Sequence, residues 1–249
     1  MLFEENMSVV SKLKRFANST TEVVPGLLYQ VTHRGTNMLV ITEEKITLVD
    51  TGLRESAPHV LDFIRCIGRS PEEIGLVIIT HNHIDHMGGL REIKEHTGAK
   101  VAVHRDDIGE RLHPPAAGSR YREPLARVKS KLQTVFSVLH EDVDFVLEGG
   151  EVLDCLGGLE VIHTPGHTPG SISLYSRNHR VLMTGDLIRK RRKTLMLPPA
   201  MVSSSLKQNL ESVRKLAGIE TDILCFGHGL PLFEEVAEKI QELLKREQV

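Results

Sequence analysis

The sequence is poor in cysteine, and its few cysteines are badly placed for cross-links. Cys66, Cys155 and Cys225 are an odd number, stand far apart and include no C-x-x-C pair. A disulfide framework is therefore excluded, and the pattern fits a reducing compartment. Cys66 and Cys225 lie within apolar segments, so we expect them to be buried packing residues.

A dominant charge, a long hydrophobic run and a signal peptide are also missing. The 31 Lys and Arg nearly balance the 33 Asp and Glu, for a net charge of -2. General nucleic-acid or membrane-surface binders usually carry a basic excess instead. No apolar stretch approaches the length of a membrane span, and the N-terminus lacks the basic and apolar regions of a signal peptide. We expect a cytoplasmic protein with a small-molecule substrate, and a homodimer is compatible with the sequence.

Short apolar runs and amphipathic segments alternate along the chain, which predicts an α/β fold. Strands are predicted at residues 26–31, 38–42, 46–49, 76–80, 100–104, 145–147, 152–153, 159–163, 172–175, 181–184 and 223–226. Helices are predicted around residues 57–64, 90–96, 206–216 and 233–243. The run 76–80 is continuously apolar, as in a strand that is covered on both faces.

Two segments depart from this alternation. The pattern predicts an amphipathic leader at residues 1–22 and one main domain at residues 23–249. A Pro-rich stretch followed by an amphipathic helix marks a helical insertion at about residues 105–140. Because loops over an active site usually shape its pocket, this insertion is a candidate lid, and we expect Arg120 or Tyr121 to bind substrate.

The clearest chemical pattern follows the predicted strand 76–80 directly. It is the hexapeptide His81-Asn82-His83-Ile84-Asp85-His86, which places three imidazoles and a carboxylate within six residues. Such groups bind zinc, iron or manganese. A loop that leaves a strand can project alternate side chains, so His81 and His83 can face one ion while Asp85 and His86 reach a second. The alternative is a polar loop that happens to be rich in histidine.

Three further ligand-type residues follow later predicted strands, and each is flanked by glycine. They are His167 in the loop 163–170, Asp186 in Thr-Gly-Asp, and His228 in Gly-His-Gly. Glycine lets the backbone turn tightly and approach an ion. Each could be a surface residue when taken singly, but together they complete two coordination shells. One ion would be bound by His81, His83 and His167, the other by Asp85, His86 and His228, with Asp186 as the bridge.

This set of motifs resembles the metallo-β-lactamase superfamily over about residues 23–230. The resemblance includes Asp50 in the segment Val-Asp-Thr-Gly. It implies a four-layer αββα sandwich with a helical insertion, and two divalent metal ions at one edge, zinc before iron or manganese. The superfamily includes thioesterases, lactonases, nucleases, phosphodiesterases, sulfatases, oxygenases and β-lactamases, so the fold leaves the substrate open.

The resemblance also assigns roles to single residues. Asp50 would orient the ligand loop through hydrogen bonds, and an ordinary turn residue before Gly52 is the alternative. The family's ligand is the histidine after Pro-Gly, which is His167, so His163 is interpreted as structural. The other histidines, such as His33, His59, His104, His113 and His179, have no comparable context.

The mechanism implied is hydrolysis of an ester, thioester, lactone or phosphodiester. Two divalent ions at about 3.5–4 Å from each other lower the pKa of a bridging water, which yields a hydroxide nucleophile near neutral pH. One ion would polarise the oxygen under attack and the other would stabilise the leaving group. Asp85 is the candidate catalytic residue, because it could both bind metal and relay a proton.

Departures from known branches narrow the substrate. Asp186 stands where zinc β-lactamases usually carry Cys or Ser, and His83 stands where flavodiiron proteins carry Glu. Only residues 229–249 follow the last metal histidine, too few for the helical domain of classical glyoxalase II. Lactonases often have a Tyr shortly after the bridging Asp, whereas Asp186 is followed here by Leu187, which weakens that assignment without excluding it. We expect a short glyoxalase II-like thioesterase or a lactonase-like enzyme, and not a true β-lactamase.

Two other functions stay open. A mononuclear iron persulfide dioxygenase has similar motifs but binds metal with two histidines and an aspartate. A nucleic-acid-processing phosphodiesterase is suggested by the basic run at residues 189–193. That run is either a solvated loop or an anion clamp in which Arg189 and Lys190 bind substrate.

Overall fold

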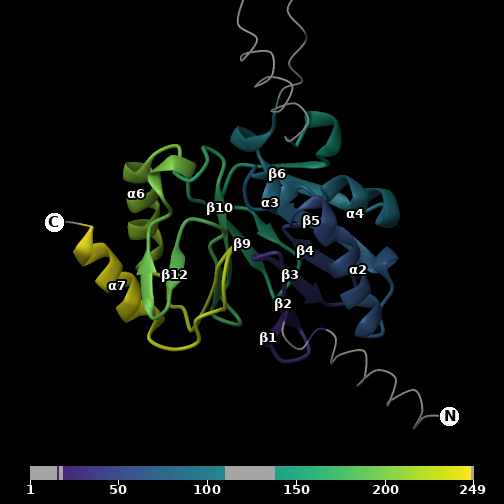
Figure 1. The fold of residues 1–249 in the computed structure, drawn as a ribbon, viewed down its shortest axis with the longest axis horizontal. Coiled ribbons are helices and arrows are strands. Elements are labelled where there is room, and N and C mark those ends of the chain that lie inside the picture. Colours follow the sequence, from purple (N-terminus) through teal and green to yellow (C-terminus); the bar gives the residue numbers. More distant parts are fainter. Residues whose placement is uncertain (1–15, 17–18, 110–137, 248–249) are drawn as a thin grey trace, which may run out of the picture.

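The computed structural model describes residues 16, 19–109 and 138–247. Two β-sheets face each other, and helices cover the outer face of each (Figure 1). A third, two-stranded sheet forms a separate hairpin. None of the helices in these residues is long and apolar enough to cross a lipid bilayer.

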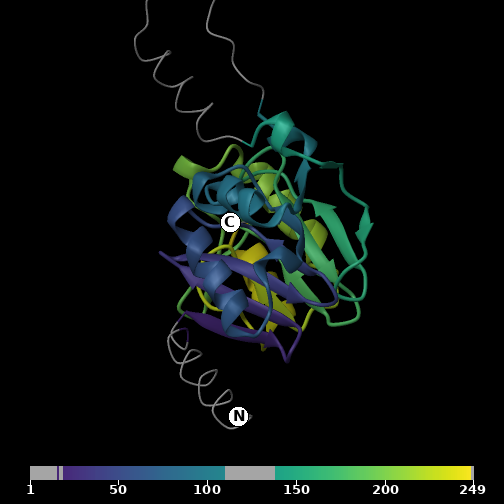
Figure 2. The same cartoon turned by 90° about the vertical axis from the view of Figure 1, so that its right-hand side faces the viewer.

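The first sheet has seven strands in sequence order. They are β1 (Thr20–Val24), β2 (Leu28–His33), β3 (Thr36–Thr42), β4 (Ile46–Val49), β5 (Ile74–Ile79), β6 (Lys100–His104) and β7 (Phe145–Leu147). Neighbours are antiparallel from β1 to β4 and parallel from β4 to β7. Helices α2 (Ala57–Cys66), α3 (Ile84–Met87) and α4 (Leu90–Thr97) connect the parallel strands. In Figure 2 the blue helices lie over the outer face of this sheet.

The second sheet has five strands in the order β14-β11-β10-β9-β8. They are β8 (Val152–Leu153), β9 (Leu159–His163), β10 (Ile172–Ser176), β11 (Val181–Met183) and β14 (Ile223–Cys225). Helices α6 (Leu206–Leu216) and α7 (Val236–Arg246) flank this sheet, together with the hairpin of β12 (Arg189–Arg191) and β13 (Thr194–Met196).

Three apolar clusters separate the layers. Strand β5 contributes side chains to two of these clusters. Val77 and Ile79 pack toward the helices of the first sheet, whereas Ile78 packs between the two sheets. A third cluster joins the second sheet to α6 and α7. A strand with both faces covered must be apolar at every position, which explains the continuous run that the sequence shows. The expected αββα sandwich is confirmed.

The predicted boundaries differ from the structure at three places. Strand β1 begins at Thr20, before the predicted start of the domain at residue 23. Phe16, within the predicted leader, lies in the first apolar cluster. Its ring centroid is 4.9 Å from that of His59 and 5.8 Å from that of Phe63. Phe233, expected in the last helix, lies before α7 and is 46% exposed.

Most of the predicted insertion, residues 110–137, lies outside the described residues. Its two ends are joined, since the Gly109 amide donates to the Val138 carbonyl at 2.8 Å. The basic run is a hairpin rather than a loop, with Arg192 at its turn in the left-handed region, at a φ of 56°. Residues 84–87 form the short helix α3 where a loop was expected.

Candidate metal centre

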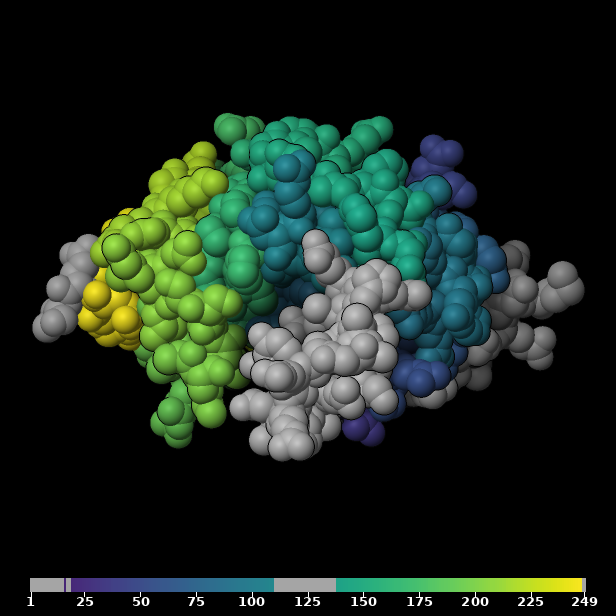
Figure 3. Space-filling view, turned by 90° about the horizontal axis from the view of Figure 1, so that it is seen from above, coloured from purple at the N-terminus to yellow at the C-terminus, as the bar shows by residue number. Residues whose placement is uncertain are grey.

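The seven predicted ligands meet at one edge of the sandwich, between the two sheets. Parallel strands β4, β5 and β6 end at the same edge of the first sheet, so the residues that follow them are neighbours. Loops after β9, β11 and β14 reach the same place from the second sheet. Figure 3 looks onto this edge from above and shows it hollowed between the blue first part and the green second part of the chain.

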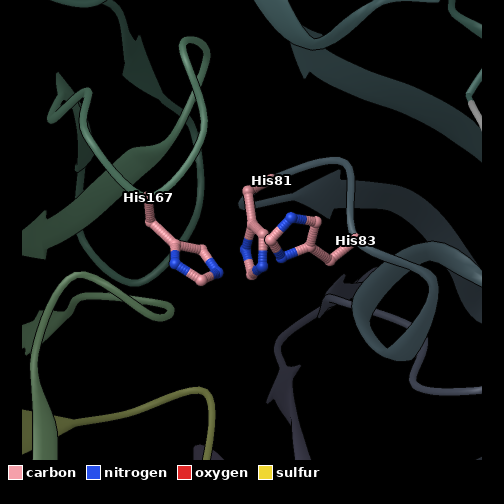
Figure 4. Close-up of side chains that lie close together, drawn as sticks. All are labelled: His81, His83 and His167. Carbon is pink, nitrogen blue, oxygen red and sulfur yellow. The ribbon is translucent and has the colours of Figure 1, made fainter. Parts of the chain in front are cut away.

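The ligand atoms form three overlapping groups, each with all its atoms within 4.8 Å of one another. The groups are His81, His83 and His167; Asp85, His86 and His228; and His81, His86 and Asp186. In Figure 4 the ring of His167 approaches from the second sheet toward those of His81 and His83. The first two groups contain the same residues as the two predicted ligand sets. Below, the first shell means the ligand set His81, His83 and His167 for one ion, and the second shell means the ligand set Asp85, His86 and His228 for the other ion.

Asp186 lies between these two shells. Its Oδ2 is 3.6 Å from His167 Nε2 and 3.2 Å from His228 Nε2. Its Oδ1 is 3.5 Å from His86 Nε2. One carboxylate therefore faces ligands of both shells, as a bridging ligand must.

Four buried atoms at this centre have no hydrogen-bond partner. They are Nε2 of His81, His86 and His167, and Oδ1 of Asp186. A buried polar atom without a partner costs about 1–3 kcal/mol, and natural structures contain few of them. Nitrogen and oxygen donors in this number fit divalent ions such as zinc. The residues present therefore fit a pair of metal ions.

The opposite nitrogen of four ligand rings, Nδ1, is held in place. The contacts are His81 to Thr80 Oγ1 at 3.0 Å, His86 to Asp50 Oδ2 at 2.7 Å, His167 to Ser203 Oγ at 3.3 Å, and His228 to the Gly35 carbonyl at 2.8 Å. A contact on one ring nitrogen fixes the ring's direction and leaves the other nitrogen free for a metal. Each of these rings therefore presents Nε2 to the centre.

Asp50 is buried and bonds the ligand loop with both carboxylate oxygens. Oδ1 accepts from the Thr80 amide and Oδ2 from the Thr80 hydroxyl, each at 2.8 Å. Oδ2 also contacts His86. The backbone of Asp50 is left-handed, with a φ of 61°, a conformation that is strained for a residue other than glycine. The surrounding hydrogen bonds hold it there.

Burial and neighbouring charges separate the pKa values of the ligands. Burial, followed by the charge of His86, lowers the pKa of His81 well below its usual value. Burial also lowers the pKa of His167 to about 4, despite the nearby Asp186. These imidazoles are neutral at pH 7, the form that binds metal.

On the aspartate-rich side of the centre, charges and hydrogen bonds outweigh the effect of burial on the pKa values. Burial lowers the pKa of His86, but the charge and hydrogen bond of Asp50 outweigh it and raise the pKa to about 9. Burial raises the pKa of Asp186, but the hydrogen bond from His228 and the charge of His86 lower it to about 2. Asp186 is therefore ionised, and an ion bound by His86 must displace a proton.

Two glycines allow the ligand segments to pack closely. A Cβ on Gly227 would lie 2.2 Å from Asp186 Oδ1 and 2.7 Å from His86 Cε1. Gly185 has a φ of +50°, and a Cβ there would lie 3.0 Å from Thr80 Oγ1. Gly227 is thus required by close contact, and Gly185 both by close contact and by its left-handed backbone.

Two of the four candidate substrate-binding residues lie within the described residues. Arg120 and Tyr121 lie outside the described residues. Arg189 is exposed on β12. Lys190 donates its ammonium to the Pro231 carbonyl at 2.8 Å and lies 5.6 Å from the centroid of the Phe226 ring. The Lys190 side chain therefore already braces the segment that follows His228.

A further group, His104, Asp106 and His163, has donor atoms close enough to suggest a metal site. The two rings, however, stack face to face, with centroids 3.9 Å apart and an interplanar angle of 18°. The in-plane lone pairs of parallel rings cannot point at one ion. Nε2 of His163 also contacts the Pro169 carbonyl at 2.9 Å. This geometry favours a packing role for His163, as the sequence pattern does.

Asp107 was missed by the sequence analysis. It follows β6 and is 4% exposed, and its carboxylate accepts hydrogen bonds from segments on both sides of the metal centre. The available indication was its position after a parallel strand next to β5, which places it at the ligand edge. Nothing local in the sequence distinguishes it from its neighbour Asp106.

Comparisons with known proteins agree with this geometry. The family model described as "Metallo-beta-lactamase superfamily" matches residues 31–228. "Probable metallo-hydrolase YflN" of Bacillus subtilis is 30% identical and is covered over 84% of each chain. "Acyl-coenzyme A thioesterase MBLAC2" of Gallus gallus is 31% identical over 64% of this chain and 60% of that protein. A metallo-beta-lactamase family protein of Thermus thermophilus has a similar fold, with a TM-score of 0.68 and 23% identity over 91% of this chain and 81% of that one.

Proposed function

The chain belongs to the metallo-beta-lactamase superfamily, and we propose that it is a binuclear zinc hydrolase acting on a small-molecule thioester or ester. Its class as a metallo-hydrolase follows from the family and from the clusters of buried His and Asp. The number and identity of the ions and the bond cleaved are the parts proposed.

One observation carries the proposal. Four buried donor atoms without hydrogen-bond partners, on His81, His86, His167 and Asp186, face one another across the two shells. Hydrogen bonds inside the protein leave these atoms unsatisfied, whereas two cations would satisfy all of them. Zinc ions held by these residues would supply Lewis acidity and would lower the pKa of a water at the site.

The exposure of the ligand side chains indicates the side from which substrate enters. The side chains of His86, His167 and Asp186 are at most 10% exposed, whereas those of Asp85 and His228 are 35% and 27% exposed. Substrate and water therefore reach the centre from the side of Asp85 and His228. Asp85 Oδ2 lies 3.4 Å from His228 Nε2, and its partial exposure lets it accept a proton and pass it to solvent.

A thioester is the first substrate to test. A relative at 31% identity over 64% of this chain is named as an acyl-coenzyme A thioesterase. Lactones and phosphodiesters remain the next candidates. Asp186, at the position where zinc β-lactamases usually carry Cys or Ser, is the reason to expect no β-lactamase activity.

The test is metal analysis combined with a substrate panel. The purified full-length chain is analysed for zinc, iron and manganese and assayed with an acyl thioester, an aryl ester, a lactone, a phosphodiester and a β-lactam. We expect two zinc ions per chain and thioester or ester hydrolysis that a chelator abolishes and zinc restores. One iron per chain with oxygen consumption on a persulfide would refute the proposal. Cleavage of the phosphodiester alone would reassign the substrate.

A further inference from the structure

The three ligands of the first shell come from two segments that no local connection holds together. His81 and His83 follow β5 of the first sheet, whereas His167 lies between β9 and β10 of the second sheet. Their spacing therefore depends on contacts between the segments. A buried carboxylate provides such contacts.

Asp107 accepts three hydrogen bonds, and they come from both segments. Its Oδ2 accepts from the Asn82 amide at 2.8 Å and from the Thr168 hydroxyl at 2.6 Å, and its Oδ1 accepts from the Gly170 amide at 2.7 Å. Asn82 stands between the two histidines of the first segment, and Thr168 follows the histidine of the second. The Asp107 carboxylate thus connects the two segments that supply the ligands of the first shell.

The packing around this carboxylate is tight. A Cβ on Gly170 would lie 2.7 Å from both Cβ and Cγ of Asp107, so the loop after His167 can approach only because residue 170 has no side chain. Among the described residues no salt bridge involves Asp107. The hydrogen bonds that this carboxylate accepts from the two ligand segments are 2.6–2.8 Å long, and hydrogen bonds to a carboxylate are stronger than those between neutral groups.

The second shell is supported by different residues. His86 is held by Asp50, and His228 by the Gly35 carbonyl. None of the hydrogen bonds to Asp107 reaches these residues. A substitution of Asp107 should therefore weaken binding of the first ion more than binding of the second ion.

We infer that Asp107 is a positioning residue that sets the affinity for the first metal ion by clamping the His81–His83 segment to the His167 loop. This inference rests on the metal centre of the proposed function. Residues that orient metal ligands typically contribute about 10–100-fold to metal affinity when removed. We expect a loss in this range for the first ion, and less than about threefold for the second.

The experiment isolates each ion in turn. In a His228→Gln background only the first shell is complete, and in a His83→Gln background only the second. Asp107→Asn is added to each, and zinc dissociation constants are measured by competition with a chromophoric chelator. The predicted weakening should occur in the first background only. Asp106→Asn is the matched control, because the Asp106 side chain is exposed and supplies no bond to either segment.

A second variant and a spectrum separate positioning from general destabilisation. Thr168→Val removes one of the three hydrogen bonds and should weaken the first ion by about threefold to tenfold, a smaller loss than Asp107→Asn causes. If Asp107→Asn does not fold, the zinc affinity of the first shell in Thr168→Val tests the inference instead. Cobalt bound to the first shell should show an altered visible spectrum in the variants, whereas cobalt in the second shell should not.

Each outcome has a definite meaning. Unchanged affinity for the first ion, or equal losses for both ions, overturns the inference. Selective weakening of the first ion supports it. Because zinc binding is the readout, a wild-type chain that binds two ions but hydrolyses none of the panel would refute the proposed function without touching the role of Asp107.

Discussion

Gly227→Ala is expected to disable the metal centre through a single methyl group. The added Cβ would lie 2.2 Å from Asp186 Oδ1, 2.7 Å from His86 Cε1 and 3.2 Å from the Gly185 carbonyl carbon. Non-bonded carbon contacts are most favourable at about 3.5–4.0 Å. The metal ligands must therefore move by roughly 1 Å. Gly227 is not among the positive-φ glycines, so alanine meets no backbone strain there.

The size of the effect follows from this displacement. Misplacing a reacting group by about 1 Å costs on the order of 100-fold in rate, which corresponds to about 2.7 kcal/mol of transition-state stabilisation. We expect kcat/KM to fall by about that factor and zinc content to drop below two ions per chain. Since the Gly227 amide still donates to the Gly185 carbonyl and its carbonyl still accepts from the Asn37 amide, the fold should persist.

Gly218→Ala is the matched control. A Cβ on Gly218 meets nothing within 4 Å, and its φ is also outside the left-handed region. Its effect on the free energy of unfolding should stay within about 0.5 kcal/mol, with zinc content unchanged. The assay compares zinc per chain, hydrolysis and thermal unfolding of the two variants. If Gly227→Ala keeps two zinc ions and wild-type kcat/KM, the argument from close packing fails.

Four further predictions concern the metal centre and its surroundings. In the metal-free protein, the pKa of His86 is raised to about 9. Protonation of His86 therefore stabilises the fold fully below pH 6.5, and this stabilisation is lost as pH rises toward 9. NMR titration should show this pKa, and Asp50→Asn should lower it. Zinc affinity should rise over the same pH range, and calorimetry in buffers of different ionisation enthalpy should show proton release on binding. Removal of metal by a chelator should lower the unfolding temperature, and zinc should restore it in a concentration-dependent way; a metal-independent unfolding temperature would contradict a metal site. His163→Gln should leave zinc content unchanged because its ring stacks on His104, and loss of an ion there would overturn that interpretation.

The sequence alone was sufficient for the family, and it named a set of donor residues whose atoms the structure brings close together. The hexapeptide at 81–86 is a local pattern, and the other three donors carry local marks of their own, namely a preceding apolar strand and flanking glycine. Periodicity also identified most strands, because a strand covered on both faces must be apolar throughout. The superfamily, the αββα fold and the metallo-hydrolase class are confirmed. The zinc identity, the substrate and the cytoplasmic location stay predictions.

The supporting contacts were beyond the sequence because they join distant segments. His228 is oriented by a carbonyl 193 residues away, and Thr168 reaches Asp107 across 61 residues. Lys190 looked like a free cation in a basic run, yet the fold brings it to the Pro231 carbonyl. A local pattern records which side chains can bind a metal. Only the packing of two sheets decides which backbone groups and carboxylates lie behind those side chains and hold them at the distance that an ion requires.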